Sequence, residues 1–127
     1  MGTIAVLEKD KMLDAVTGGA SYTAPTDCYA KLHIGDPGSA GTSNAAAETT
    51  RKIVAFGTPS SSASIASTAA VQWTSLPAAE TISWVSFWSA STAGTFLGKD
   101  DLPTARTVAI GDTLTINSGD ITFSIAD

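Results

Sequence analysis

Apolar and polar residues alternate in short runs through most of the chain, and this pattern predicts β-strands. The run at 28–34 (CYAKLHI) places small and apolar side chains on one face and polar ones, including His33, on the other. Similar runs, separated by turn residues, follow at 51–57, around Ile65, and at 70–76, 94–98, 105–110 and 113–125. We therefore predict an all-β fold: a single antiparallel β-sandwich or jelly-roll-like domain of about seven to eight short strands.

The run at 80–90 (ETISWVSFWSA) differs because it is apolar on both faces. Strict alternation puts Ile82, Trp84 and Trp88 on one face, and Val85 and Phe87 on the other. A strand of this kind is covered on both sides, so we expect it at the centre of a sheet.

The last part of the chain predicts a hairpin. Leu114 and Ile116 are expected to pair with the run at 121–125, which contains Ile121, Phe123 and Ile125, across a turn at 117–120.

The first 19 residues have a different period. Met12 and Val16 are four apart and Val6 and Leu13 are seven apart, which is helical spacing. A short helix is expected, with Thr3 as a candidate cap and Gly18-Gly19 as its end. We divide the chain into an arm at 1–19 and a β-sandwich domain at 20–127.

The apolar stripe of this arm is narrow, so the helix needs a partner surface to persist. We predict that the arm docks on another protein through Ile4, Val6, Leu7, Met12 and Leu13.

Composition points to packing against protein. Only 15% of the 127 residues are charged, whereas soluble monomers carry about 25%. The net charge is −5 and the basic residues are scattered, which argues against nucleic acid or an anionic membrane as a partner.

The N-terminal apolar run, Ile4–Leu7, is too short for a signal segment, so export by the secretory route is not expected.

Three glycines in LHIGDPGSAGT (32–42) raise the question of a phosphate-binding loop. The segment lacks the lysine of a P-loop, and Asp36 would repel an anion. Gly35, Asp36, Pro37 and Gly38 are instead predicted to form a tight turn, in which proline fixes φ and glycine supplies a positive φ.

No set of residues predicts catalysis, a metal or a cofactor. Cys28 and His33 are the only cysteine and histidine, too few for a zinc site in one chain. Cys28 is interpreted as a small buried residue, and His33 as a solvated or interface residue rather than a catalytic base. The chain is expected not to be an enzyme.

Two weaker alternatives remain open. Asp100, Asp101 and Asp112 could bind calcium, although turn residues explain them better because no loop of alternating oxygen ligands is present. The tryptophans could stack on sugars, although core packing is favoured for a set within hydrophobic strands: Trp73, Trp84 and Trp88.

Four segments carry a resemblance to a family of small virion proteins of tailed bacteriophages, those of actinobacterial hosts being nearest. These segments are YAKLHIGDPGSAGT, RKIVAFG, VQWTSLPAAETISWVSFWSASTAGTFLG and RTVAIGDTLTINSGDITFSI, and they cover most of the chain. Members of this family are labelled tail-fibre, minor structural or capsid decoration proteins. The Gly-rich stretch resembles the signature turn of the family.

The resemblance implies a structural component of the phage particle, assembled in the host cytoplasm. We expect a capsid decoration protein bound to the major capsid protein, as a homo-oligomer with a trimer favoured. The alternative is a tail-fibre or receptor-binding module that contacts the host cell surface.

Overall fold

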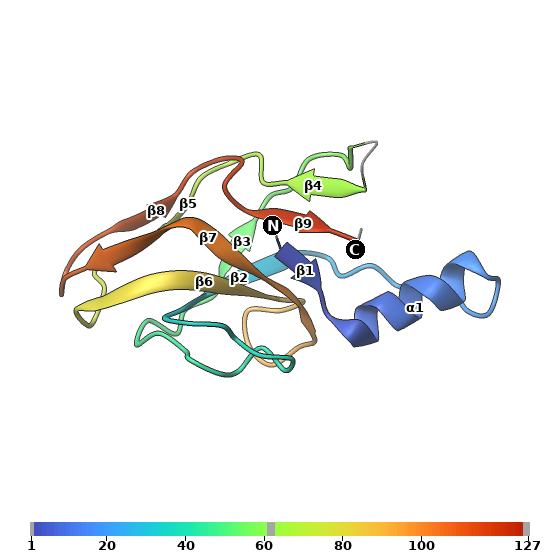
Figure 1. Cartoon of the computed structure of the whole chain (residues 1–127), viewed down its shortest axis with the longest axis horizontal. Helices are drawn as coiled ribbons and strands as arrows, with labels where there is room; N and C mark the ends of the chain where they lie inside the picture. Colours follow the sequence, from blue (N-terminus) through green and yellow to red (C-terminus); the bar gives the residue numbers. More distant parts are fainter. Residues whose placement is uncertain (1, 61–62, 126–127) are drawn as a thin grey trace.

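The computed structural model describes residues 2–60 and 63–125. Within this part of the chain, one helix and nine strands follow in the order β1 (Gly2–Ile4), α1 (Val6–Val16), β2 (Cys28–His33), β3 (Lys52–Val54), β4 (Ser64–Ala66), β5 (Val71–Trp73), β6 (Glu80–Trp88), β7 (Phe96–Val108), β8 (Leu114–Ile116) and β9 (Thr122–Ser124) (Figure 1). Seven strands form one sheet in the order β3-β2-β6-β7-β1-β9-β4, and β5 and β8 form a second. The all-β class is confirmed, but the large sheet is mixed because β1 runs parallel to β9.

The large sheet curls until its two edges meet. An isolated bridge joins Phe56, after β3, to Ser67, after β4. Two backbone hydrogen bonds support it, from Gly57 N to Ala66 O (3.1 Å) and from Thr68 N to Ala55 O (2.9 Å). The edge strands therefore satisfy some of their free backbone groups on each other, which limits pairing with a further chain.

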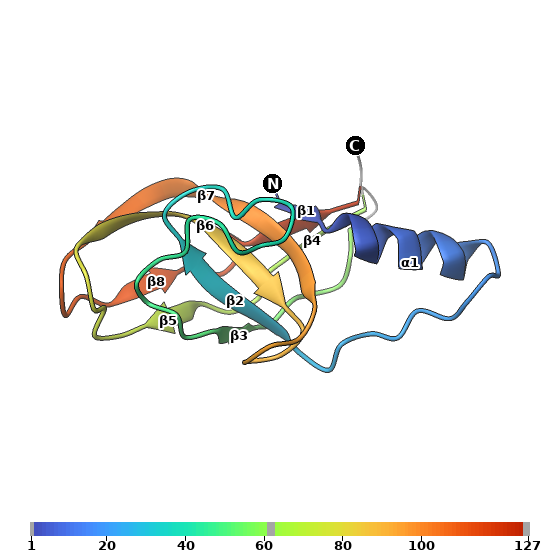
Figure 2. The ribbon, with the colours of Figure 1, turned by 90° about the horizontal axis from the view of Figure 1, so that it is seen from below.

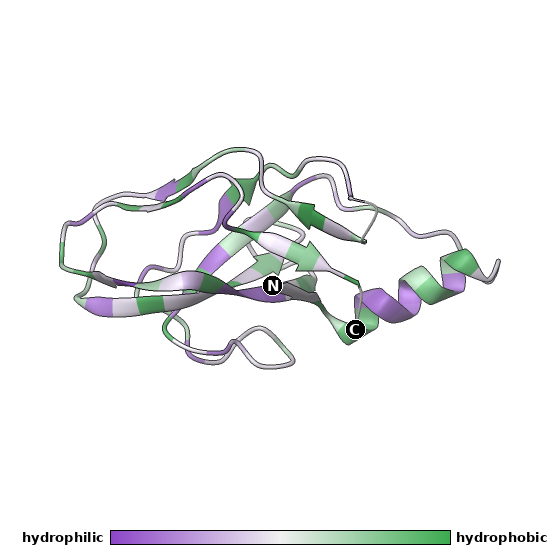
Figure 3. Cartoon of the chain, turned by 45° about the horizontal axis from the view of Figure 1, so that its top comes forward, coloured by the Kyte–Doolittle hydropathy of each residue, from purple (hydrophilic) through white to green (hydrophobic). Residues whose placement is uncertain are grey.

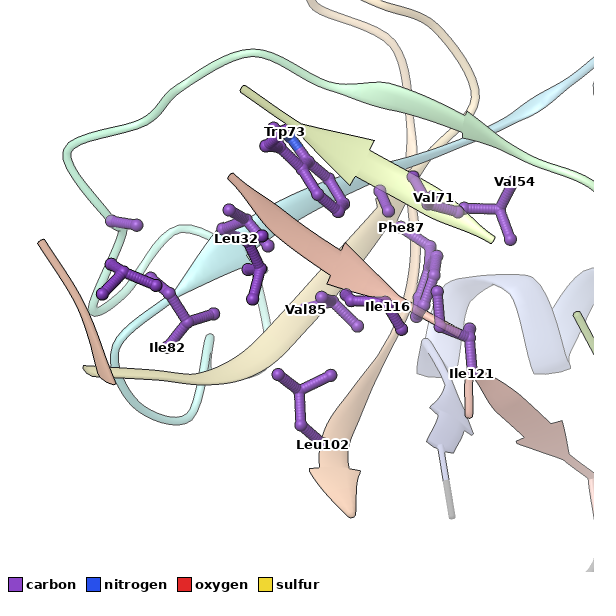
Figure 4. Close-up of a cluster of buried hydrophobic side chains, with 14 of the residues drawn as sticks. Leu32, Val54, Val71, Trp73, Ile82, Val85, Phe87, Leu102, Ile116 and Ile121 are labelled. Carbon is purple, nitrogen blue, oxygen red and sulfur yellow. The ribbon is translucent and has the colours of Figure 1, made fainter. Parts of the chain in front are cut away.

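The hydrophobic core lies between the β5–β8 pair and the inner face of β2 and β6. Figure 4 shows Trp73 and Ile116 from the first layer near Leu32 and Phe87 from the second. Trp73 and Phe87 are fully buried, and Phe87 forms an edge-on contact with Phe123 (4.4 Å between centroids). Two layers packed face to face give a sandwich-like arrangement.

The strand β6 is central, as expected, between β2 and β7, but Ile82 lies on a different face from the one predicted. The pairing register shifts between Ile82 and Trp84, and Ile82 joins Val85 and Phe87 in the core. This irregular pairing interrupts the two-residue alternation of β6, which strict periodicity cannot anticipate.

The strand β7 is longer than the two short strands expected at 94–98 and 105–110. Its residues Asp101 and Arg106 pair with Trp84 and Ile82, so four residues of β7 bulge out opposite Ser83 alone. Pro103 lies in this bulge, where its missing N–H costs no ladder hydrogen bond.

The expected C-terminal hairpin is wrong. The strand β8 pairs with β5, whereas β9 pairs with β1 and β4 in the other sheet. Between them Gly119 has φ +87°, and its N–H donates to Ser67 O (2.9 Å). The turn thus carries the chain from one layer to the other instead of folding it back on itself.

The N-terminal helix is confirmed, but Thr3 does not cap it. Thr3 lies in β1, which is inserted between β7 and β9, and the helix starts after Ala5, whose N–H donates to Leu97 O (2.8 Å). The helix ends before Gly18, at φ +83°. Figures 1 and 2 show α1 projecting from one end of the β-body, and Figure 3 shows hydrophobic residues along it.

Candidate functional site

The residues Gly35 to Gly38 form a turn that lies against the outer face of the large sheet. Asp36 Oδ1 accepts a hydrogen bond from Gly38 N (2.8 Å), and Gly38 adopts φ +78°. Lys99 on β7 forms an ion pair with Asp36 (2.6 Å). The side chain of Lys99 and the N–H of Gly38 hold the pKa of Asp36 below its usual value. Pro37 is fully buried, so this turn covers the sheet rather than binding a phosphate.

His33 is fully buried beneath residues 35–43, which we call the turn segment, and its interpretation as a solvated or interface residue is wrong. Its ring contacts Ser43 O through Nδ1 (2.8 Å) and Ser86 Oγ through Nε2 (2.7 Å). A carbonyl only accepts, so Nδ1 carries the proton and Nε2 accepts from the Ser86 hydroxyl. Ser86 in turn accepts from Trp88 Nε1 (2.8 Å). Alternation along β2 identified the face of His33 but not the loop that covers this face.

The Ser86–His33 pair matches two members of a catalytic triad only in the distance between them. Burial lowers the pKa of His33, with Lys31 acting in the same direction against the hydrogen bond to Ser43. Both side chains are 0% exposed, so no substrate reaches the hydroxyl. The chain from Trp88 through Ser86 and His33 to Ser43 satisfies buried polar groups and fixes the turn segment to the sheet.

The other candidate residues differ in accessibility. Burial raises the pKa of Cys28 to about 12, which makes its thiol unreactive. Trp73 is fully buried and Trp88 lies under the Arg51 guanidinium (4.2 Å to the ring centroid). Trp84 is half-buried, and its ring centroid lies 5.5 Å from Lys99 Nζ. Among the described residues, no group of three or more His, Cys, Asp and Glu side chains is placed to hold a metal ion.

Helix α1 carries the largest exposed apolar side chains near the N-terminus. Val6 and Leu7 are 70% exposed, Leu13 63% and Val16 84%. We call these four residues the α1 patch. No helix within residues 2–60 and 63–125 is both long and apolar enough to span a membrane.

The other two predicted docking residues face the body. Ile4 is a strand residue packed against the core, and Met12 is half-buried. Both line an apolar hollow of about 240 Å³ at the edge formed by β9 and β4, together with Ile65, Phe123 and Ile125. The predicted docking set is thus split between the α1 patch and this hollow.

A buried carboxylate holds α1 to the segment that follows it. Glu8 is 3% exposed and accepts hydrogen bonds from Lys11 Nζ (2.7 Å) and Tyr22 OH (2.5 Å). Burial alone would raise the pKa of Glu8, but these two donors outweigh it and the pKa lies below its usual value. Burial and the Glu8 contact raise the pKa of Tyr22 to about 12.

The comparison with known families decides what kind of protein carries this arrangement. The sequence model described as "Podophage GP4 fiber I protein gp80" matches residues 3–124. The chain belongs to this fibre family. The match spans β1 to β9 and thus includes both α1 and the turn segment. The chain matches no curated protein.

Membership in the gp80 fibre family confirms the resemblance to bacteriophage virion structural proteins. It favours the tail-fibre alternative, and it supports neither capsid decoration nor an actinobacterial host. The family implies that the chain is a component of the phage particle.

Proposed function

We propose that this protein is a non-enzymatic module of a phage tail fibre that contacts the host cell surface and self-assembles through α1. The supporting observation is the combination of fibre-family membership with four large apolar side chains, 63–84% exposed, on a helix that projects from the body. An 11-residue helix is marginal by itself in water, so a second surface against this patch would stabilise it.

The charges beside the patch favour a second copy of this chain as the partner. Val6 and Leu13 are one heptad apart, and at 3.6 residues per turn they lie at nearly the same angle on the helix. Lys9 and Asp14 flank them on opposite sides and are five residues apart. In parallel helices around a rotation axis, this spacing pairs Lys9 of one copy with Asp14 of the next. We propose a cyclic oligomer, with a trimer as the expected form.

Oligomeric state tests this proposal. The molar mass of the full chain, measured by light scattering after size-exclusion chromatography, is expected to be that of an oligomer. Leu13→Gln should give a monomer with an unchanged β-sheet circular dichroism spectrum. Ile110→Gln is the matched control, because Ile110 is 75% exposed but lies on the body. A monomeric parent chain, or equal behaviour of the two variants, would contradict self-assembly through α1.

Copy number in purified particles tests the location in the particle. Quantitative mass spectrometry against the major capsid protein is expected to give a few copies per particle, as for a fibre. Hundreds of copies would instead indicate a protein bound on the capsid lattice and would overturn the fibre assignment.

A further inference from the structure

A cavity of about 310 Å³ lies at the root of α1, between the start of the helix, β7 and the turn segment. Its lining combines the Phe96 ring with two lysines, Lys9 and Lys99, and two hydroxyl side chains, Thr3 and Ser39. The lining comes from three segments that are far apart in the sequence, at 3–9, 38–39 and 96–99, and only the fold brings them together.

Neighbouring residues pack closely against Phe96, which forms the apolar wall of the cavity. The Phe96 ring packs on Trp88 (5.5 Å between centroids). Gly41 lies so close that a Cβ there would collide with the Phe96 ring. Gly98 also lines the cavity, and a Cβ on it would collide with Thr3 O. The wall is thus rigid and offers an apolar surface before any ligand arrives.

Both charged side chains that line the cavity are lysines, although the chain carries a net charge of −5. Lys99 is fixed by its ion pair with Asp36 (2.6 Å) and by its position near Trp84. Within one copy Lys9 has no ion-pair partner among the described residues. Its ammonium has three N–H donors, so it can contact a ligand as well as Asp14 of a neighbouring copy. Val6, the first residue of α1, and Ala5 before it also line the cavity and bring the positive end of the helix dipole to it.

We propose that this cavity binds a negatively charged sugar unit. The apolar face of the sugar ring packs on Phe96, the acidic group contacts Lys9 with Lys99 behind it, and Thr3 and Ser39 exchange hydrogen bonds with ring hydroxyls. The proposed fibre function brings the chain to the host cell surface, where a polysaccharide would supply the sugar unit. The choice of this ligand source rests on that function. Carboxylate and phosphate groups both carry the negatively charged oxygens that lysines bind. The probes described below distinguish the two groups.

Calorimetric titration of the full chain tests the cavity with three probes: a galacturonate oligomer, a glycerol-phosphate oligomer and neutral maltohexaose. One or both acidic probes should bind, with affinity that falls as salt is raised. Maltohexaose should not bind. Binding of the galacturonate alone identifies a carboxylated ligand, and binding of the glycerol phosphate alone a phosphorylated one.

Variants localise this binding. Lys9→Gln is expected to weaken it about fivefold or more, because one charge-assisted contact is lost. Lys52→Gln, which removes the same charge from β3, is the matched control and should leave the affinity unchanged. Ser39→Trp, at an exposed turn position, should block the cavity and abolish binding.

Three results would overturn the proposal: no binding of either acidic probe, equal binding of maltohexaose, or equal effects of Lys9→Gln and Lys52→Gln. Oligomeric state and copy number are measured separately. A low-copy oligomer that binds no acidic probe would overturn the cavity assignment alone.

Discussion

The β-body and helix α1 use apolar residues in opposite ways. In the body, Trp73, Val85 and Phe87 are fully buried between two sheet layers. In α1, Leu7 and Val16 are 70% and 84% exposed, and the most buried side chain of the helix is the charged Glu8. The hydrophobic effect therefore stabilises the body within one copy of the chain.

The same effect would act on α1 only on contact with another surface. Large apolar side chains that stay exposed together on one element often mark an interaction site. The contrast separates the part of the molecule that carries stability from the part to which the proposed function assigns assembly. Substitutions in each part should therefore change different measurements, and the following predictions run from the largest expected effect on stability to the smallest.

The largest effect is expected in the core. Phe87→Ala should lower the free energy of unfolding by about 3–5 kcal/mol, because it removes a fully buried ring that contacts Phe56 and Phe123. Urea denaturation followed by tryptophan fluorescence measures the change. A loss below about 1 kcal/mol would show that this layer is not the stabilising core.

The outer face of the sheet should contribute less. Ser86→Ala removes the acceptor of Trp88 Nε1 and the donor to His33 Nε2, so two buried polar groups lose a partner. We expect a loss of about 2–3 kcal/mol in the free energy of unfolding, measured by urea denaturation. Thr81→Ala, at an exposed position of the same strand, is the control and should change stability by at most about 0.5 kcal/mol. Equal effects of the two variants would mean that the buried hydrogen-bond chain contributes nothing.

A pH-dependent effect is expected at Asp100, which is 1% exposed and accepts a hydrogen bond from Thr122 N (2.9 Å). Burial raises the pKa of Asp100 to about 6, above the value of an unfolded chain. The folded state therefore holds this proton more tightly, and stability is lost as the pH rises from about 4 through about 6.

Asp100→Asn should remove this dependence. Urea denaturation at several pH values is expected to give a parent-minus-variant stability difference that falls by roughly 1–3 kcal/mol over that window and then stays level. A constant difference across the window would contradict the raised pKa.

The smallest effect on stability is expected in α1. Val16→Asn should change the free energy of unfolding of the monomeric Leu13→Gln background by at most about 0.5 kcal/mol, because its side chain is 84% exposed. Removing residues 2–4 instead should destabilise the body strongly, since β1 pairs with both β7 and β9. A large loss from Val16→Asn, measured by urea denaturation, would mean that α1 belongs energetically to the body.

Much of the fold follows from short-range pattern. Period-two runs identify strands such as β2 and β5, and helical spacing identifies α1, because these periodicities depend only on local backbone geometry. The run apolar on both faces placed β6 at the centre of a sheet. The errors lie where pairing departs from regularity, as in the bulge after Ile82 and the crossing between β8 and β9. Both depend on which distant strand offers the better packing.

The site was predicted only in part. Val6, Leu7 and Leu13 were singled out because a narrow apolar stripe is visible in one helix, and all three are exposed. Their docking role stays a prediction. Phe96 and Lys99 were missed, since nothing near them in the sequence indicates that they lie beside Lys9. The alternation along β7 assigns Phe96 and Lys99 to a face of the strand. It indicates a site only when the segments that pack beside β7 are known.

The sequence by itself determined the all-β class, the short helix and the turn residues at 35–38, since each depends on the preferences of adjacent residues. Tertiary structure alone decided the burial of His33, the insertion of β1 into the sheet and the cavity between Lys9, Phe96 and Lys99. The physical reason is the separation in sequence between the residues whose contacts decide each feature. Alternation assigns a side chain to a face, but whether that face meets water, a loop or another strand depends on contacts between residues far apart in the chain.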